Sequence, residues 1–361
     1  MLTVVRVLYL VGRLQRGGVF YVLVREVQLC LTRGVDVAIG ALEASSKALM
    51  ELRELGLIDR TFIGIDSLGR VAREVDVVHV HDGFRLFLYA RLNRWLDELF
   101  RIKPIVVTFH GIPDVKLLPL RSWPWWFTFN ILYYRLLKRY AKLVIAVSEY
   151  VAKQLKLHGI KPIILYNGVD IPSQKSYKRY VGDTLELLYV GSAAKHKRLE
   201  ELLFLVDRLG EQLSRALSID VRLTVVGFNV EELARKYKSK RIVFYGSLPR
   251  KEVLKFYATK HIYVSPSAWE GFGMGVLEAL SHGMPVIARD IPVMKELYGR
   301  CPSVKLLKSF KDYKTFAKYL KEILNKYEYY SALAIRCAAN YTWDKHIDKL
   351  LSLYENVASK R

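Results

Sequence analysis

Short segments rich in Val, Ile and Leu alternate along this chain with glycine-containing turns and amphipathic segments, which restricts the folds open to it. The segments are continuously apolar, as is typical of strands buried on both faces of a sheet. Such strands, alternating with helices, form βαβ units and a parallel sheet. The predicted strands are Val4–Val11, Asp36–Gly40, Val75–His79, Pro104–Phe109, Leu143–Val147 and Pro162–Tyr166, then Leu185–Val190, Val221–Val226, Ile242–Phe244, His261–Val264 and Pro285–Ala288.

The two series of strands are separated by a polar segment, Asp170–Asp183, which is predicted to be a linker. A length of 361 residues suits two domains. We therefore expect an α/β protein with two Rossmann-like, doubly wound parallel-sheet domains facing a central cleft, with ligands beyond the carboxyl ends of the strands. The N-terminal domain is predicted over residues 1–170 and the C-terminal domain over residues 184–342, followed by a last helix over residues 343–360.

The chain has a large excess of positive charge, with 57 Lys and Arg against 35 Asp and Glu and a net charge of +22. Both halves carry the excess, which argues against a basic tail. This charge suits nucleic acid, an anionic membrane or a phosphorylated substrate, and does not distinguish among them. A hydrophobic content of 52% excludes disorder as the main state.

No run of 18 apolar residues occurs, and the N-terminal segment has the pattern of a core strand, so neither a transmembrane helix nor a signal peptide is predicted. Cys30, Cys301 and Cys337 lie far apart and have no metal-binding spacing. We expect no disulfide framework and a reducing, cytoplasmic location, because disulfides are rare there.

The most informative segment runs from Val264 to Leu280. A strand is predicted to end near its start, and a glycine-rich loop then leads into a helix that begins near Met274. Backbone N–H groups at a helix start, beside glycines that permit close approach, suit a phosphate. Glu270 and Glu278 flank this loop, and since a carboxylate repels a phosphate, we expect both to bind sugar hydroxyls beside it. The alternative is a structural turn in which Glu278 stabilises the helix dipole.

Three histidines follow predicted strands. His79 and His81 end one strand, where a buried structural histidine and a rim residue are expected. The turn His110-Gly111 lies at the carboxyl end of the next strand and is expected to point into the cleft.

The Glu270–Glu278 segment resembles the Glu-x7-Glu signature of glycosyltransferase family 4, whose members are retaining, nucleotide-sugar-dependent enzymes of GT-B fold. Other landmarks of that family follow in its order along most of the chain, and together they are specific although each alone is weak. They are Gly17-Gly18, Asp76-Val77-Val78-His79-Val80-His81, Thr108-Phe109-His110-Gly111, Val147-Ser148, Tyr166-Asn167-Gly168-Val169-Asp170, Tyr189-Val190-Gly191, Val225-Val226-Gly227 and Thr342-Trp343. The resemblance also implies that the last helix crosses back to the N-terminal domain.

The resemblance implies a role at the donor for each matching residue. Glu278 would bind the ribose hydroxyls, Glu270 would bind hydroxyls of the donor sugar, and His110 would lie by that sugar. The diphosphate would be held by the loop Gly271, Phe272, Gly273 and Met274, beside Gly17 and Gly18 across the cleft. Gly191 is also expected to lie at the donor.

The resemblance also implies an Arg and a Lys that neutralise the diphosphate. In the segment from Gly191 to Arg198, Lys197 matches the Lys, whereas Ser192 occupies the usual Arg position. Lys195 or Arg198 is expected to substitute for that Arg. Losing one cation or donor preset for the charge of a leaving group typically costs about 3–4 kcal/mol of transition-state stabilisation.

No metal or other cofactor is expected besides the nucleotide-sugar co-substrate, because no Asp-x-Asp occurs in a likely loop. Retention in the family is described as a front-face reaction, in which the acceptor hydroxyl attacks as the diphosphate leaves and a donor phosphate oxygen takes its proton. That reaction needs no enzymic nucleophile, and the chain contains neither Gly-x-Ser-x-Gly nor His-Glu-x-x-His.

A tryptophan cluster followed by cations stands out in the first half. The tryptophans are Trp123, Trp125 and Trp126, and the cations are Arg135, Lys138 and Arg139. Aromatic rings beside cations suit a membrane interface, and the segment is too short to span a bilayer. The alternative is a core helix with a basic outer face. In the GT-B fold the N-terminal domain binds the acceptor, so the first hypothesis implies a lipid-linked acceptor and a protein peripheral on an anionic membrane.

The function predicted is transfer of a glucose- or mannose-type sugar from a nucleotide-diphosphate donor to an acceptor hydroxyl, with retention. The first alternative is a sugar-nucleotide epimerase or a glycan phosphorylase on a similar scaffold, although a pyridoxal-phosphate site and a much longer chain are not evident. The second is a non-catalytic basic protein that binds membrane or nucleic acid. It predicts loss of Glu270 or Glu278, and both are present. No nucleic-acid partner is expected, since no recognisable binding module occurs.

Overall fold

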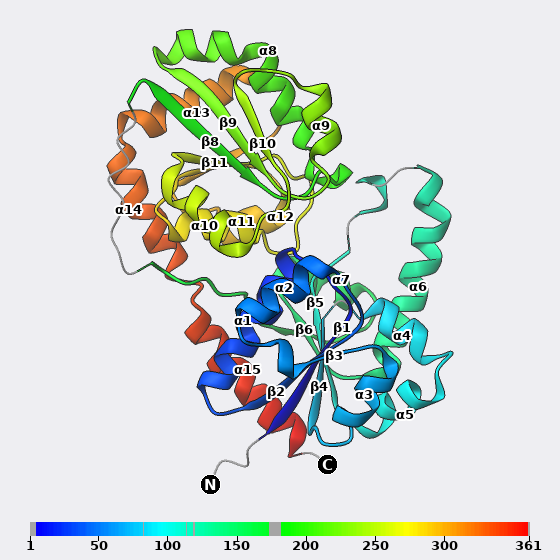
Figure 1. Ribbon diagram of the computed structural model, residues 1–361. Coiled ribbons are helices and arrows are strands. Elements are labelled where there is room, and N and C mark those ends of the chain that lie inside the picture. The colour runs from blue at the N-terminus through cyan, green and yellow to red at the C-terminus, as the bar shows by residue number, and fades with distance from the viewer. Residues whose placement is uncertain (1–4, 82, 113, 118–119, 173–181, 360–361) are drawn as a thin grey trace. The chain divides into compact units, whose positions relative to one another are not determined.

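The computed structural model describes residues 5–81, 83–112, 114–117, 120–172 and 182–359, and the chain forms two compact units (Figure 1). The N-unit comprises Met1–Ile112, Leu120–Asn167 and Asp344–Arg361, and the C-unit comprises Pro113–Pro119 and Gly168–Trp343. Most of the predicted linker Asp170–Asp183, namely residues 173–181, lies outside the described residues.

The N-unit is built on a parallel sheet with the strand order β3-β2-β1-β4-β5-β6-β7. Its strands are β1 (Arg6–Leu14), β2 (Asp36–Ala44), β3 (Thr61–Ile63), β4 (Val77–His81), β5 (Ile105–Phe109), β6 (Ala141–Ala146) and β7 (Ile163–Ile164). The chain first moves outward from β1 to β3 and then continues on the other side of β1, so the strand order reverses between β1 and β4. The short edge strand β3 was not predicted.

Three helices bury their apolar faces in one core of the N-unit: α1 (Gly18–Thr32), α2 (Ser46–Glu54) and α15 (Trp343–Ala358). From α15, the apolar residues Ile347, Leu350 and Tyr354 recur at helical spacing and join this core. The last helix therefore packs in the N-unit, beside α1 in Figure 1, although it follows the C-unit in the chain. The other helices of the N-unit are α3 (Ile65–Val71), α4 (Phe84–Ala90), α5 (Arg94–Ile102), α6 (Trp123–Tyr140) and α7 (Glu149–Leu157), with 3₁₀ turns at η1 (Ile58–Arg60) and η3 (Leu120–Ser122). The 3₁₀ turn η2 (Val115–Leu117) lies in the segment that belongs to the C-unit.

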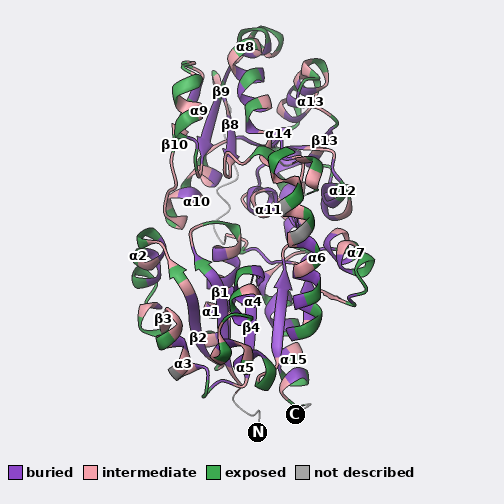
Figure 2. Ribbon diagram, turned by 90° about the vertical axis from the view of Figure 1, so that its right-hand side faces the viewer, coloured by how far each residue is buried: buried purple, intermediate pink, exposed green. Residues whose placement is uncertain are grey.

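The C-unit repeats this plan with the parallel order β10-β9-β8-β11-β12-β13, which reverses between β8 and β11. Its strands are β8 (Thr184–Val190), β9 (Asp220–Val226), β10 (Ile242–Tyr245), β11 (Ile262–Ser265), β12 (Val286–Arg289) and β13 (Val304–Leu307), of which β13 was not predicted. Its helices are α8 (Leu199–Leu217), α9 (Glu231–Lys236), α10 (Arg250–Thr259), α11 (Met274–Ser281), α12 (Pro292–Tyr298), α13 (Tyr313–Asn325) and α14 (Tyr327–Ala338). Figure 2 shows strands of both sheets largely buried and helices with one exposed face, as the sequence pattern predicts.

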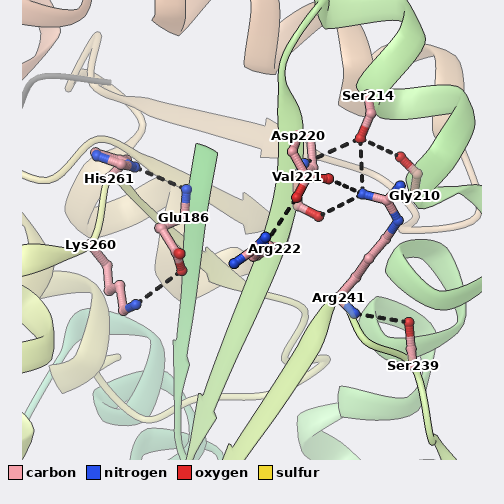
Figure 3. A network of polar contacts seen from close by, with 10 residues as sticks. All are labelled: Glu186, Gly210, Ser214, Asp220, Val221, Arg222, Ser239, Arg241, Lys260 and His261. Carbon is pink, nitrogen blue, oxygen red and sulfur yellow. Dashed lines mark hydrogen bonds and ion pairs between the residues drawn. The ribbon is translucent and has the colours of Figure 1, made fainter. Parts of the chain in front are cut away.

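A polar network ties the amino ends of the C-unit strands to their neighbours (Figure 3). Asp220, at the start of β9, accepts hydrogen bonds from Arg241 and, at 3.0 Å, from Arg222. On β8, the backbone N–H of Glu186 donates to Nδ1 of His261 at 2.9 Å, and its carboxylate pairs with Lys260 at 2.9 Å. These contacts lie at the amino ends of the strands, so they support the sheet and leave its carboxyl ends to the candidate site.

The structure corrects the expectation about cysteines. Cys301 and Cys337 form a disulfide, with a sequence separation of 36. The spacing carried no signal for it, because the pairing depends on how α14 packs beside the segment before β13. Cys30 is free and buried in the N-unit core.

Candidate functional site

The predicted site residues of the N-unit follow the strands on both sides of the reversal point. Gly17 and Gly18 follow β1, and His110 comes directly after β5. His81 ends β4 between them and is buried, so the expectation of a rim residue there is wrong. In a parallel sheet the carboxyl ends of adjacent strands lie at one edge, and a reversal of strand order opens a crevice there. The topology therefore brings these separate motifs to one edge of the N-unit sheet.

The glycine pair lines a pocket of about 390 Å³ between the end of β1 and the start of α1. A Cβ atom added at Gly17 or Gly18 would meet no atom within 4 Å. Packing does not demand glycine here, so the bare backbone leaves room for another group to approach.

Three arginines line the same pocket, and none of them was predicted. Arg13 and Arg16 flank the glycine pair in the sequence, whereas Arg85 comes from α4. Arg16 pairs with Glu51 at 2.5 Å and both side chains are buried, while Arg13 lies 3.8 Å from Glu43. Arg13 and Arg16 could have been identified from the sequence, because they lie close to Gly17 and Gly18 in the chain. Arg85 could not, because only the folding of α4 beside β1 brings it to this pocket.

His110 contacts a second imidazole. Its Nε2 lies 3.2 Å from Nδ1 of His81, which is buried. Burial, aided by His81, lowers the pKa of His110 to about 3. The ring is therefore neutral at ordinary pH, and it is able to donate at one nitrogen and accept at the other.

In the C-unit, the loop after β11 leads into α11, which begins at Met274 as predicted. Gly273 caps this helix with a φ of +86°, and a Cβ atom there would lie 2.4 Å from Met294, so both backbone and packing require glycine. The first helical N–H groups bonded to the carbonyl of Gly273 are those of Val276 and Leu277. The N–H groups of Met274 and Gly275 precede these bonds and lie at the positive end of the helix dipole.

Glu270, in this loop, pairs with Lys197 at 2.6 Å between Oε1 and Nζ. Lys197 ends a 3₁₀ turn, η4 (Lys195–Lys197), which follows β8. The backbone N–H of Ala268 donates to the carbonyl of His196 at 2.8 Å and joins the two loops. The structure thus brings together a carboxylate and a cation that the sequence analysis assigned to sugar and diphosphate separately.

The other two predicted cations lie beside Lys197 in the chain. Lys195 is exposed, and Arg198 is half-buried with a left-handed φ of 51° at the start of α8. The structure thus gathers three cations around one turn after β8, next to the loop that carries Glu270.

Glu278 is buried in α11 and pairs with Arg250 at 2.7 Å between Oε1 and an Nη atom. It lies beyond the first turn of the helix, so the alternative of a dipole-stabilising first-turn acid is wrong. Arg250 begins α10 and was not predicted, because no motif links the two helices.

The turn at Gly191 is held by two buried tyrosines. The hydroxyl of Tyr189 donates to the carbonyl of Ser192 at 2.8 Å, and that of Tyr263 donates to the carbonyl of Val190 at 3.0 Å. A Cβ atom at Gly227 would lie 1.7 Å from the carbonyl oxygen of Gly191. The turns after β8 and β9 therefore pack backbone against backbone, and Gly227 has no room for a side chain.

The predicted tryptophan segment forms the start of α6, a helix with one buried face and one exposed face that carries apolar residues and cations. One face is buried through Tyr133, Leu136 and Leu137. The other exposes Phe127 and Ile131, by 50% and 55%, and the cations Arg135, Lys138 and Arg139. Trp123 and Trp126 are half-buried, and the side chain of Trp125 lies outside the described residues.

Comparisons with known proteins agree with this arrangement. Residues 171–357 match the family model "Glycosyl transferases group 1", and residues 4–172 match "Glycosyltransferase Family 4". The chain is 25% identical over 239 residues to an uncharacterised 41.2 kDa protein in the cps region of Klebsiella pneumoniae, covering 62% of each chain. It is 27% identical over 267 residues to a GDP-mannose-dependent α-mannosyltransferase of Mycobacterium tuberculosis, covering 72% of this chain and 65% of that one. The chain thus spans somewhat less than two thirds of these relatives.

Solved structures resemble the whole chain. Anabaena HepE in complex with UDP and glucose has a TM-score of 0.77 at 16% identity and covers 98% of this chain and 100% of that one. Sucrose-phosphate synthase from Thermosynechococcus elongatus has a TM-score of 0.69 at 15% identity, covering 99% and 100%. Together with the two parallel-sheet units, these likenesses show the GT-B fold. On its sheets, its glycine loops and both family matches, the chain belongs to the group 1, family 4 glycosyltransferases.

Proposed function

We propose that this glycosyltransferase moves a glucose- or mannose-type sugar from a nucleotide-diphosphate sugar to an acceptor hydroxyl, with retention of configuration. The observation that carries the proposal is the pair of ion-paired carboxylates, Glu270–Lys197 and Glu278–Arg250, on either side of the glycine loop at the start of α11. Each carboxylate is partly or fully shielded from water and held in place by a cation, as a group that positions hydroxyls must be.

The proposed roles follow from what each group can bind. Glu278 accepts hydrogen bonds from the ribose hydroxyls and Glu270 from the donor sugar. The diphosphate lies at the N–H groups that begin α11, where the helix dipole favours an anion. Lys197, with Lys195 and Arg198 from the same turn, neutralises the charge that develops on the leaving diphosphate. In the N-unit, the pocket at Gly17 and Gly18 offers an open backbone and arginines to an anion.

The proposed chemistry needs no nucleophile from the protein. The acceptor oxygen forms a bond to the anomeric carbon on the face from which the diphosphate departs, and the acceptor proton passes to a phosphate oxygen of the leaving group. The enzyme contributes orientation and preset charge. Metal independence remains a proposal, and EDTA treatment tests it.

Two donor bases follow from the comparisons. One relative is named for GDP-mannose, and a structure of similar fold holds UDP and glucose. Thermal unfolding of the protein with UDP-, GDP- and ADP-sugars distinguishes them, since a ligand of the native state raises the midpoint by mass action. One class should raise it, and Glu278→Ala should abolish the rise. No shift with any nucleotide sugar would count against the proposal.

We further propose that α6 meets an anionic membrane and that the acceptor is lipid-linked. The described helices include none long and apolar enough to cross a bilayer. The support is the exposed stripe of α6, defined as Phe127, Ile131, Arg135 and Lys138, which recurs at helical spacing with apolar residues followed by cations. Such a stripe buries its apolar end among headgroups and attracts anionic lipid with the other end.

Flotation with liposomes tests this proposal. Vesicles containing anionic lipid should recover the protein, and Phe127→Ser with Ile131→Ser should reduce recovery several-fold. Trp126→Ala is a second variant on the same helix. Phe204→Ser is a matched control, because Phe204 is exposed by 56% on α8 of the C-unit. Equal recovery of the stripe variant and the control would remove the proposal.

A further inference from the structure

A carboxylate lies in the N-unit core where helix periodicity places apolar residues. Glu26 on α1 is 1% exposed, and Leu23, Val27 and Cys30 of the same helix are core residues. A buried carboxylate is costly unless it is paired and hydrogen-bonded. The partners of Glu26 therefore indicate why it is tolerated.

The first partner is His346 on α15. Its Nε2 lies 3.0 Å from Oε1 of Glu26, and its Nδ1 lies 2.8 Å from the carbonyl oxygen of Tyr166. A carbonyl only accepts, so Nδ1 carries a proton, and the contact at Nε2 requires a further proton between the two groups. Burial raises the pKa of Glu26, but His81 and His346 outweigh it and hold that pKa well below its usual range. Glu26 is therefore ionised.

The neighbouring His79 is engaged elsewhere. Its Nδ1 lies 2.6 Å from the hydroxyl of Tyr354, and its Nε2 lies 2.7 Å from that of Thr108. Tyr354 in turn donates to the hydroxyl of Tyr9 at 2.7 Å. Ligand atoms of Glu26, His79 and His81 are close enough to surround a metal ion. Both nitrogens of His79 are taken by short hydrogen bonds, however, so the contacts favour a hydrogen-bond network.

The remaining oxygen of Glu26 faces His81. Oε2 lies 3.2 Å from Nε2 of His81; both atoms are buried, and within the described part of the chain neither has another hydrogen-bond partner. A carboxylate only accepts, so Nε2 of His81 carries a proton, and in a neutral His81 ring the lone pair is then on Nδ1. That lone pair faces Nε2 of His110 at 3.2 Å. His110 therefore donates from Nε2, and its own Nδ1 is left as an acceptor.

We propose that His81 is neutral and that Glu26 is a positioning residue which, through His81, holds His110 in the tautomer with an unprotonated Nδ1. This inference rests on the proposed function, with His110 beside the donor sugar as the family resemblance implies. There an acceptor nitrogen takes a hydrogen bond from a sugar hydroxyl, and a ring of the opposite tautomer would present a second donor to it. At metal sites, a carboxylate that accepts a hydrogen bond from a ligating histidine fixes the tautomer of that histidine in the same way. We call the contacts from Glu26 through His81 to His110 the relay. The titratable groups around it include His79, His346, Tyr9, Tyr354 and Cys30.

Nitrogen spectroscopy of the full chain, labelled with ¹⁵N-histidine and free of ligand, tests the tautomer directly. Long-range ¹H–¹⁵N correlation at neutral pH should show His110 protonated on Nε2 only, with the signal assigned by its loss in His110→Asn. In Glu26→Gln and His81→Leu the signal should change to a mixture of tautomers. A wild-type His110 protonated on Nδ1, or a pattern unaltered in both variants, overturns the proposal.

Kinetics with the donor found by thermal shift separate positioning from folding. Replacing His81 by Asn keeps an acceptor near the position of Nδ1, so kcat should stay within about 5-fold, whereas His81→Leu should lower kcat about 100-fold with little change in the donor KM. His79→Leu is the control on the same strand: it should lower the unfolding midpoint and leave kcat nearly unchanged. Equal kcat values for His81→Asn and His81→Leu contradict the relay.

Two further outcomes show whether the relay fails, the proposed function fails, or the cluster is instead a metal centre. A fixed tautomer without any transferase activity would mean that the proposed function fails while the relay stands. Stoichiometric metal in the purified wild-type protein, lost in Glu26→Gln, would identify a metal centre and overturn the relay.

Discussion

Lys197 and Glu270 lie 73 positions apart in the chain, and the fold brings Nζ of one to 2.6 Å from Oε1 of the other. Both side chains are only partly exposed, by 21% and 15%, so the pair is shielded from salt more than a surface ion pair. In the proposed reaction, Lys197 holds Glu270 ready before the donor arrives and then shares its charge with the diphosphate.

Replacing Lys197 tests this double role. Lys197→Met should lower kcat about 100- to 1,000-fold, because a preset charge at the leaving group is worth about 3–4 kcal/mol. Steady-state kinetics with the identified donor measure the effect. Lys236→Met is the control, since Lys236 makes an exposed ion pair on α9. Comparable losses in the two variants would exclude a special role for Lys197.

Arg250 should matter to both stability and donor binding. Its removal leaves Glu278, 7% exposed, without this cation, and breaking a largely buried pair costs up to about 3 kcal/mol. Arg250→Met should therefore lower the unfolding midpoint and weaken the donor-induced shift. The double variant Arg250→Met with Glu278→Gln should recover part of the stability but not the shift. A single variant as stable as wild type would show that the pair contributes nothing.

A side chain at Gly18 should separate stability from ligand binding. A Cβ atom there meets nothing within 4 Å, and Gly18 is the first residue of α1. Gly18→Ala should leave the free energy of unfolding unchanged or raise it by up to about 1 kcal/mol. Donor-induced stabilisation should fall, because the methyl group occupies the approach to the backbone. Urea unfolding with and without donor measures both, and an unchanged donor effect would place the ligand elsewhere.

Acid should destabilise the fold before its carboxylates titrate. Burial lowers the pKa of His110 to about 3 and holds that of His79 well below its ordinary 6.5. The unfolded chain binds protons on both groups below about pH 6.5 and the native state does not, so their contribution is complete above that pH and is lost as pH falls toward 3. Each group contributes up to about 1.4 kcal/mol per pH unit.

Chemical unfolding between pH 7.5 and 4.5 measures this slope. His110→Asn should reduce it, because one of the two groups is removed. A free energy of unfolding that is flat over this range would contradict the neutral state of both rings.

The disulfide predicts a response to reductant. Cross-linking residues separated by 36 positions restricts the unfolded chain and typically stabilises a protein by about 2–4 kcal/mol. Adding a phosphine reductant should lower the unfolding midpoint of the wild type. Cys301→Ser with Cys337→Ser should already be lower and should not respond. Mass spectrometry that finds both thiols free in non-reduced protein would remove this prediction.

Sequence patterns predicted much of the fold because they are local. Continuous apolar runs identified most strands of both sheets, and the glycine loop before Met274 identified the start of α11. The edge strands β3 and β13 were missed because neither has a long continuous apolar run: β3 spans only Thr61–Ile63, and Lys305 interrupts β13. The landmarks Gly168 and Thr342-Trp343 were recognised separately, and the structure explains both: a Cβ atom at Gly168 would lie 2.5 Å from the backbone of Trp343.

By itself, the amino-acid sequence determined the fold class, the family and the residues of the glycine loop with Glu270 and Glu278, because each depends on residue types at short spacing. Tertiary structure alone decided the partners: Arg250 for Glu278, Lys197 for Glu270, Cys337 for Cys301 and the chain of contacts from Glu26 to His110. The physical reason is that a charge, a thiol or an imidazole acts over a few ångströms, and which groups come that close depends on packing between elements far apart in the chain.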